Sequence, residues 1–542
     1  MKYLILITAL TCYFAGCKMK ENAELVFINA RIYTVDSAFS VQQAMAVTDG
    51  MILATGTNEE ILEAWKPDSL IDLGGKPVFP GFNDGHCHFF GYALSLYHSV
   101  SLKGTASFDE ILQLLRNYHE KHPYVWILGR GWDQNDWPVK EFPDNSKLDK
   151  LFPDNPVVLT RVDGHAVLAN SEALRRAGIS AKTKIDGGEV MVKNGKLTGI
   201  LLDKATDLIS AIIPDADAGI KKDALLKAQE DCFSVGLTSV SDAGLDFENV
   251  MLIDSLQFSG SLKIRINAML SPSGKNIAEF VEKGPFQKDR LTVNSIKLYA
   301  DGALGSRGAL LLEPYSDDPG NYGLLMSSDD YFREILKKAF EKNFQVNTHC
   351  IGDSANRMIL NLYGEVLGMN NDRRWRIEHA QVVHPDDFRL FGDYSIIPSI
   401  QSTHCTSDMY WAGERLGSER VKGAYAYKQL LEQNGWLING TDFPVESINP
   451  LLTFYAAVTR KDKDGYPSGG FQPENALSRE EALKSITIWP ARGAFEETRK
   501  GSLEPGKFAD FVILEKDIMD INLVEVPDVK VIETYLDGVK VY

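Results

Sequence analysis

Residues 78–88 read VFPGFNDGHCH, a short apolar run followed by two histidines one residue apart. The run Val78–Gly81 predicts a buried strand, and His86 and His88 come directly after it. On an extended chain, residues two apart point to the same face, with Cα atoms roughly 6.6 Å apart. Both imidazoles can therefore reach one cation, so this segment predicts a strand that delivers two metal ligands.

Strand-like and helix-like runs alternate downstream, a pattern typical of βα units around a parallel sheet. Eight is the number of strands that closes a barrel. The sequence therefore predicts the α/β class with a (β/α)8 TIM barrel. The eight buried-looking runs are Val78–Gly81, Thr238–Asp242, Ile264–Leu270, Ser295–Ala300, Gln345–Thr348, Trp375–Ile377, Ser395–Ser399 and Trp436–Ile438.

The two ends of the chain depart from this pattern. Residues 24–72 and the segment after Phe508 read as short strands with hairpin turns such as Asp49-Gly50 and Asp537-Gly538. We expect residues 17–78 and 496–542 to form one small composite β-sandwich, with the barrel at residues 79–495. The interval of about 104–236 is too long for one crossover, so it predicts a long insertion after the first strand.

Residues 1–16 are interpreted as a lipoprotein signal peptide. Lys2 precedes a short apolar stretch, Tyr3–Phe14, which falls far below the ~20 residues of a membrane-spanning helix. The stretch leads into Ala15-Gly16-Cys17, which resembles a lipobox except that Phe14 replaces the usual Leu. We expect a protein of the bacterial cell envelope, lipid-anchored through Cys17 on the periplasmic side or the cell surface. An uncleaved signal anchor is the alternative.

The charge balance narrows the classes of partner. The chain has 57 Lys and Arg against 74 Asp and Glu, a formal net charge of −17, and contains no long basic run. Because nucleic-acid binding needs a cationic face, this charge balance disfavours a nucleic-acid partner. We expect a small-molecule substrate and membrane contact through the lipid anchor alone. The sequence leaves a homodimer open.

Further candidate ligands end other predicted strands, where the active sites of barrels lie. His349, His379 and Asp442 each close such a run, and Lys297 lies within one. Four of the ten histidines therefore fall where barrel chemistry is expected, which core packing does not readily explain. The predicted metal ligands are His86, His88, Lys297, His349, His379 and Asp442.

These motifs resemble the amidohydrolase superfamily, and more narrowly its YtcJ-like and N-substituted formamide deformylase branch, the amidohydrolase 3 family. The resemblance covers nearly the whole chain after residue 17. It is carried by PGFNDGHCH (80–88), KLYADGALGSR (297–307), HCIGD (349–353), IEH (377–379), GTDFP (440–444) and PGKFADFV (505–512).

The resemblance implies a binuclear site. His86, His88 and Asp442 would hold one ion, and His349 and His379 would hold the second. An ammonium cannot ligate a cation, so Lys297 would bridge the ions only as a CO₂-derived carbamate. An unmodified, salt-bridging Lys297 would leave a single ion. We expect one or two divalent metal ions per chain, best matched by Zn²⁺, with nickel, manganese and iron left open.

The expected chemistry follows from this cluster. Metal coordination lowers the pKa of bound water from 15.7 toward about 7. Asp442 would take the proton and deliver it to the departing amine, although a helix N-cap is its alternative role. We predict hydrolysis of a non-peptide C–N bond, such as an amide or an N-formyl or N-acyl compound. The alternatives are a lactone or ester hydrolase, a deaminase, and a non-catalytic envelope lipoprotein that binds metal or solute.

The insertion and the loops supply candidates for substrate binding. Trp132 and His165 lie in two insertion motifs, 129–137 and 163–166, and are predicted to line the pocket. His165 is also a candidate for contact with the substrate carbonyl oxygen, or else a hydrogen-bonded loop residue. Asp301 and Arg307 lie in a Gly-rich loop, with Arg307 expected to pair with a substrate carboxylate or within an internal salt bridge. His404 is a further substrate-binding candidate.

Overall fold

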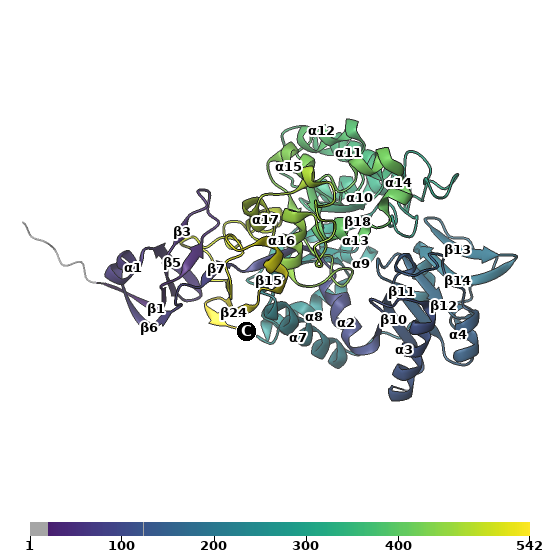
Figure 1. Ribbon diagram of the computed structural model, residues 1–542, viewed down its shortest axis with the longest axis horizontal. Coiled ribbons are helices and arrows are strands. Elements are labelled where there is room, and N and C mark those ends of the chain that lie inside the picture. The colour runs from purple at the N-terminus through teal and green to yellow at the C-terminus, as the bar shows by residue number, and fades with distance from the viewer. Residues whose placement is uncertain (1–19, 123) are drawn as a thin grey trace, which may run out of the picture.

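A computed structural model describes residues 20–122 and 124–542, and its strands form four sheets (Figure 1). In Figure 1 a small two-sheet unit lies at one end, a barrel in the middle and an inserted sheet at the opposite end. Residues 1–19, which hold the expected signal peptide and Cys17, lie outside the described residues.

The barrel is built from eight parallel strands in chain order, and β18 also pairs with a short antiparallel strand, β17 (Phe286–Gln287). All eight strands are mostly or fully buried, which fits a parallel sheet covered by helices. The strands are β8 (Phe82–Cys87), β15 (Leu237–Leu245), β16 (Arg265–Leu270), β18 (Leu291–Tyr299), β19 (Gln345–Cys350), β20 (Arg376–His379), β21 (Ile397–Ile400) and β22 (Ile438–Asn439).

Helices follow the barrel strands along the chain, as expected for βα units. The first of them are α2 (Phe89–His98), α8 (Phe247–Phe258), α9 (Gly274–Glu279), α10 (Asp329–Glu341), α11 (Asp353–Leu367) and α12 (Phe388–Asp393). The remainder are α13 (Ser402–Asp408), α14 (Ala412–Arg420), α15 (Tyr427–Asn434), α16 (Pro450–Thr459), α17 (Arg479–Ser485) and α18 (Ile488–Gly493). The expected (β/α)8 architecture is confirmed.

The expected first barrel strand is wrong. Val78–Gly81 mostly falls in β7 (Pro77–Pro80), which pairs with β23 (Phe511–Leu514) and β2 (Arg31–Tyr33) outside the barrel. The chain passes close to Thr238 at Gly81, where an added Cβ would lie 2.3 Å from Thr238 Oγ1, and the barrel strand begins at the next residue. Two strands thus follow one another where the apolar run was read as one. His86 therefore lies inside β8 rather than after the strand.

The other seven expected runs each overlap a barrel strand. The first and last strands meet through backbone hydrogen bonds from Asp442 N to His86 O, 2.8 Å, and from His88 N to Phe443 O, 2.8 Å. Gly85 permits this approach, because an added Cβ there would lie 2.1 Å from Ile438 Cγ2.

Both chain ends contribute to the sandwich. One sheet has the order β5-β4-β1-β6 and the other β25-β24-β23-β7-β2-β3. They share one apolar core, in which the rings of Phe27 and Phe511 make an edge contact with centroids 5.0 Å apart. The remaining bounds are β1 (Glu21–Ile28), β3 (Val41–Gln42), β4 (Ala44–Thr48), β5 (Met51–Gly56), α1 (Asn58–Ala64), β6 (Trp65–Asp72), β24 (Val531–Leu536) and β25 (Val539–Lys540).

The insertion forms a six-stranded sheet of its own with two small apolar cores. It begins at β9 (Val100–Ser101) and its last strand is β14 (Lys196–Asp203). The expected end at residue 236 is too late, because α7 (Ala218–Ser234) packs on α2 and β15 and buries its apolar side chains in the barrel core. The other elements are α3 (Phe108–Lys121), β10 (Ile127–Trp132), α4 (Ser146–Leu151), β11 (Val157–Arg161), β12 (Ala166–Ala169), α5 (Ser171–Arg176), β13 (Gly188–Lys193) and α6 (Asp207–Ser210).

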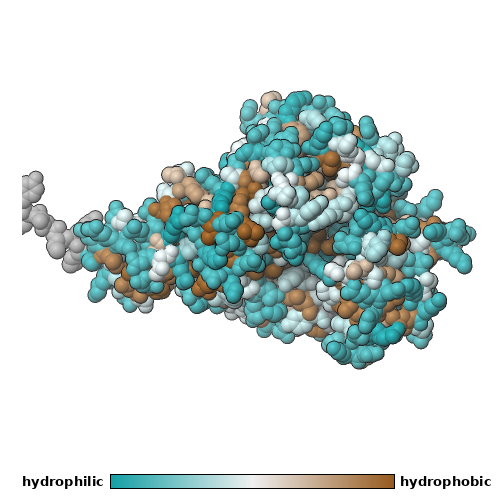
Figure 2. Space-filling view, viewed as in Figure 1, coloured by the Kyte–Doolittle hydropathy of each residue, from teal (hydrophilic) through white to brown (hydrophobic). Residues whose placement is uncertain are grey.

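The surface in Figure 2 is mostly hydrophilic, with hydrophobic residues gathered in small groups. Within the described residues, no helix combines the length and apolarity that crossing a bilayer requires. The four cysteines of this part of the chain, Cys87, Cys232, Cys350 and Cys405, are buried free thiols.

A buried cation joins the barrel to the C-terminal strands. Arg265, at the start of β16, is 3% exposed and pairs with Asp510 through Nε–Oδ2 and Nη2–Oδ1 contacts of 2.6 and 3.1 Å. It also pairs with Asp537, and its guanidinium lies 3.7 Å from the ring centroid of Phe508.

We predict that Arg265→Ala lowers the free energy of unfolding by about 3–5 kcal/mol, because it leaves Asp510 buried without its cation. Urea unfolding measures the change. The control is Arg290→Ala, since the Arg290 side chain is 27% exposed in its pair with Asp537 and should contribute less than about 1 kcal/mol. Equal losses in both variants would contradict a buried anchoring role for Arg265.

Candidate metal centre at the barrel mouth

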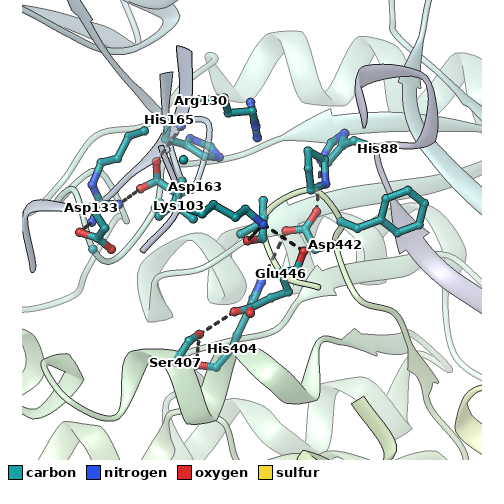
Figure 3. A pocket seen from close by; sticks show the side chains of 18 of the residues that line it. His88, Lys103, Arg130, Asp133, Asp163, His165, His404, Ser407, Asp442 and Glu446 are labelled. Carbon is teal, nitrogen blue, oxygen red and sulfur yellow. Dashed lines mark hydrogen bonds and ion pairs between the residues drawn. The ribbon is translucent and has the colours of Figure 1, made fainter. Parts of the chain in front are cut away.

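Histidines from several elements of the barrel converge on Asp442, which follows β22; Figure 3 labels His88, His404 and Asp442. His88 Nε2 lies 3.2 Å and His86 Nε2 3.6 Å from Asp442 Oδ1. On the other side, His404 Nε2 lies 3.7 Å from Asp442 Oδ2. Two triads result, His86–His88–Asp442 and His379–His404–Asp442, and within each the potential ligand atoms all lie within 4.8 Å of one another.

The aromatic contacts extend this cluster. The ring of His379, at the end of β20, lies 5.0 Å from that of His86 and 4.6 Å from that of His349. His349 belongs to neither triad, because its Nε2 faces the Gly302 carbonyl oxygen at 3.5 Å and Asp301 Oδ1 at 3.7 Å. His404 is therefore an immediate neighbour of Asp442. His349 belongs to neither triad and contacts the ring of His379.

A buried network orients His86. Its Nδ1–H donates to Glu378, which also accepts from Ser399 Oγ at 2.7 Å and pairs with Arg376 Nε at 2.6 Å. The side chains of His86, Glu378 and Arg376 are fully buried. Because Nδ1 is engaged, Nε2 of His86 is directed toward the cluster, which is the usual arrangement of a metal-binding imidazole.

Electrostatics favour the ligand forms of these groups. Burial lowers the pKa of His86 to about 4 and holds those of His349 and His379 well below the usual range. Burial alone would raise the pKa of Asp442, but the hydrogen bond from His88 and the neighbouring histidines lower it well below its ordinary value. At neutral pH, His86, His349 and His379 are therefore neutral and Asp442 is a carboxylate, the forms that bind a cation.

Two buried nitrogen atoms of the cluster bear on whether a metal ion fits here. His379 Nδ1 and His404 Nε2 have no hydrogen-bond partner among the described residues. A buried polar atom left unsatisfied costs free energy, and a cation would supply the missing interaction. The donor set of imidazoles with one carboxylate matches a divalent metal such as zinc. The residues present fit a metal ion.

The backbone at two of these residues is unusual. His379 has φ 73° and Asp442 has φ 56°, both in the left-handed region that residues other than glycine rarely adopt. Such conformations concentrate at functional sites, where surrounding contacts hold them. Here they turn both side chains into the mouth immediately after their strands.

Lys297 lies on β18 with its side chain fully buried. Its Nζ is 3.5 Å from His86 Nε2 and 4.8 Å from the ring centroid of Tyr299, and no carboxylate of the described chain lies within 4.0 Å. Burial lowers the pKa of this amine to about 8. Among the described residues Lys297 therefore forms no salt bridge within 4.0 Å, and its modification stays a prediction.

The inserted sheet reaches the same cluster. The ring of His165 lies 4.9 Å from that of His349, and His165 Nδ1 lies 2.8 Å from Asp203 Oδ1. Burial opposes protonation of His165, but the bond to Asp203 raises its pKa overall. His165, His404 and Asp442 all line a cavity of about 680 Å³, whose apolar wall includes Tyr92, Trp411 and Phe443.

The structure places three expected pocket residues outside this cavity, namely Trp132, Arg307 and Asp301. Trp132 is 1% exposed in the core of the insertion and donates through Nε1 to Leu159 O at 2.9 Å, because a β-bulge between Arg130 and Trp132 breaks the alternation of side chains. Arg307 pairs with Asp317 at 3.2 and 2.8 Å, the internal salt bridge, and does not line this cavity.

Asp301 has a structural role. It is fully buried and accepts backbone hydrogen bonds from Leu310, Ile351 and Gly352 at 2.8–3.0 Å. It therefore fastens the loop after β18 to the end of β19 rather than contacting substrate.

Other functional groups were not singled out from the sequence. Glu378 lay within the IEH motif, and Tyr299 lay two residues after Lys297, on the same face of the strand. Arg130 lay in the insertion motif, two residues before Trp132, and it lines the cavity. The alternation of strand side chains could have found Glu378 and Tyr299, whereas the bulge that frees Arg130 has no evident sequence signal.

We predict that Glu378→Gln weakens metal binding about 10- to 100-fold, because it removes the charge that orients and polarises His86. Competition with a chelator, followed by metal analysis, measures the effect. Glu365→Gln on the exposed face of α11 is the matched control and should leave metal affinity unchanged. Unaltered metal affinity in Glu378→Gln would exclude an orienting role.

Comparison with known proteins agrees with this geometry. The model of the amidohydrolase family, Amidohydro_3, matches residues 69–542. YtcJ of Bacillus subtilis (strain 168), whose name assigns it to the amidohydrolases, is 33% identical over 523 residues, 94% of this chain and 98% of its own. The N-substituted formamide deformylase of Arthrobacter pascens is 27% identical over 548 residues, 97% of this chain and 99% of its own.

A solved structure has the same architecture. An uncharacterized metal-dependent hydrolase from Pyrococcus horikoshii OT3 superposes with a TM-score of 0.75 at 29% identity, covering 92% of this chain and 99% of that protein. The family match spans most of the chain, including the whole barrel with its histidine cluster. The protein belongs to the amidohydrolase family of metal-dependent hydrolases.

Proposed function

We propose that this protein is a zinc-dependent enzyme that hydrolyses a non-peptide C–N bond in an amide, N-formyl or N-acyl compound. The observation that carries the proposal is the position of Asp442, a buried carboxylate among His86, His88, His379 and His404 at the barrel mouth. The likeness to a protein named N-substituted formamide deformylase supports a C–N bond as the target.

The residues proposed to hold metal are His86, His88, His379 and Asp442, with His349 and a modified Lys297 completing a second position. A divalent cation bound there would supply a Lewis acid that acidifies water and polarises a carbonyl group. Zinc suits this mixture of imidazole and carboxylate donors. His404 is proposed to line the substrate position beside Asp442.

Asp442 is proposed as the proton shuttle. Its carboxylate belongs to both triads and is kept ionised, so it can accept the proton of the attacking water. The same oxygen would then deliver that proton to the departing amine. His165, whose pKa is raised by its bond to Asp203, is proposed to donate a hydrogen bond to the carbonyl oxygen as negative charge develops there.

Lys297 is proposed to carry a carbamate. A buried ammonium without a carboxylate within ion-pair distance is costly, and here the amine lies 3.5 Å from Nε2 of His86. Reaction of the amine with CO₂ would replace that cation with oxygen donors, which a cation can use. The geometry of Lys297 supports this assignment independently of the family likeness.

The envelope location is part of the proposal. The described chain begins at Lys20 beside β1, in the sandwich, which Figure 1 shows at the end of the molecule opposite the inserted sheet. An anchor attached at Cys17 would therefore leave the barrel mouth, bordered by the inserted sheet, accessible to small solutes.

The first test of the proposed function uses the purified zinc-loaded protein and a panel of N-formyl and N-acyl compounds, with lactones and esters in parallel. We expect bound zinc and release of amine from at least one amide. Hydrolysis of esters or lactones alone would replace the C–N assignment, and retained zinc without any turnover would favour solute binding.

We predict that Asp442→Asn lowers kcat about 100- to 10,000-fold on an amide that the wild type hydrolyses, because the amide side chain cannot accept the proton. Metal content and thermal unfolding, measured in parallel, separate loss of the shuttle from loss of the site. An unchanged kcat would exclude Asp442 as the shuttle.

We also predict that Lys297→Ala lowers the metal content from about two ions toward one, with activity partly restored by added short-chain carboxylates. The wild type should lose the same ion in CO₂-depleted buffer and regain it with bicarbonate. Full metal occupancy in Lys297→Ala would contradict a bridging carbamate.

A further inference from the structure

Among the described residues, one cation of the pocket, Arg130, has no carboxylate within ion-pair distance, although Asp442 and Asp163 act on it from further away. Arg130, on β10, lines the cavity of about 680 Å³, and Figure 3 shows it between His165 and His88. Its buried Nε has no hydrogen-bond partner, and its guanidinium forms no ion pair within 4.0 Å among the described residues. An arginine held in a pocket without an anion pays the cost of burial without the usual compensation.

The nearby carboxylates are already engaged. Asp163 pairs with Arg161 and accepts a hydrogen bond from His165 N at 3.0 Å. Asp133 also pairs with Arg161. These ion pairs leave Arg130 as the unpaired guanidinium of this wall.

The local backbone exposes the guanidinium to the cavity. The β-bulge at Gly131, where φ is 105°, separates Arg130 from Trp132, which points into the core of the insertion. Gly164 lies against the guanidinium, because an added Cβ there would stand 3.3 Å from Arg130 Nη2. A side chain at position 164 would crowd this face, so glycine keeps it open.

A second cation lies on the same wall. Lys103 donates from Nζ to the backbone oxygens of Val445 at 3.0 Å and Glu446 at 3.2 Å, and it also lines the cavity. Figure 3 shows Lys103 reaching toward Glu446, beneath Arg130 in this view. Lys103 is thus held by the protein, whereas Arg130 is free to take a ligand.

Resting on the proposed function, we infer that the substrate carries a carboxylate that pairs with Arg130 while its amide lies at Asp442. The substrate class would then be N-acyl or N-formyl amino acids and similar anionic amides. The planar fork of a guanidinium matches the two oxygens of a carboxylate.

The surroundings favour a singly charged group over a phosphate. Asp133, Asp163 and Glu446 line the same cavity, and a dianion would be repelled by them more strongly than a carboxylate would. The apolar wall of Tyr92, Trp411 and Phe443 gives room for a hydrophobic side chain beside the charged end. A small amide with one carboxylate and one apolar group fits both features.

The test separates binding from turnover. The probes are 4-oxo-4-phenylbutanoate, in which a C–C bond replaces the C–N bond of N-benzoylglycine, and its uncharged carboxamide. Calorimetry with the zinc-loaded protein compares the wild type with Arg130→Met, which removes the charge, and Arg130→Lys, which keeps the charge and removes the fork. Arg175→Met on the exposed face of α5 is the matched control.

We predict that the wild type and Arg175→Met bind the carboxylate about 10- to 100-fold more tightly than the carboxamide, the range expected for a hydrogen bond to a charged group. Arg130→Met should lose this preference while its affinity for the carboxamide and its thermal unfolding stay unchanged, and Arg130→Lys should keep part of it. Equal binding of both probes to the wild type, or a preference that survives in Arg130→Met, overturns the inference.

Turnover distinguishes this inference from the proposed function. If the binding preference depends on Arg130 but no N-acyl or N-formyl amino acid is hydrolysed, the carboxylate site stands and the proposed reaction fails. If uncharged amides are hydrolysed as well as their carboxylates, with equal kcat/KM and equal binding, the reaction stands and the carboxylate site fails.

Discussion

The site depends on how the first and last strands of the barrel meet. Asp84, buried in β8, accepts hydrogen bonds from Thr441 Oγ1 at 2.7 Å and from the backbone nitrogens of Thr441 and His86. Gly440 allows this contact, because an added Cβ would lie 2.5 Å from His86 N. One carboxyl group therefore sets the distance between the strand that carries two histidines and the segment that carries Asp442. Since β22 has only two residues, these contacts, rather than a long ladder, fix the position of Asp442.

Around that junction the protein controls protonation by burial. Burial lowers the pKa values of His86 and His379, while the imidazoles around Asp442 keep its carboxylate ionised. Glu378 engages His86 from behind and is itself held by Arg376 and Ser399. The barrel thus supplies the reacting groups, and the inserted sheet supplies His165 and Arg130 on the opposite wall of the cavity.

Much of this arrangement could be predicted from the sequence, because the side chains that do the chemistry end strands of a repeating unit. His86, His88, His379 and Asp442 were expected together for that reason, and they do converge. The first strand was misassigned because two strands, β7 and β8, adjoin without a polar turn between them. Trp132 was expected in the pocket, but the bulge between Arg130 and Trp132 reverses which face the side chain takes, and periodicity alone does not reveal a bulge. For Arg307 the sequence left open a substrate carboxylate or an internal salt bridge, and the structure shows the salt bridge, with Asp317 ten residues further along the loop.

The sandwich has a consequence for the order in which the molecule is completed. Strand β7 pairs Val78 with Ile513 of β23. A strand from the first sixth of the chain therefore completes its pairing only after one from the last tenth has been synthesised. During synthesis β7 therefore has β2 on one side but no neighbour on the other until nearly all residues have left the ribosome. The barrel can assemble progressively, strand by strand, but the two-sheet unit closes only as the final step, and a nascent or truncated chain would present an open, adhesive edge at Pro77–Pro80.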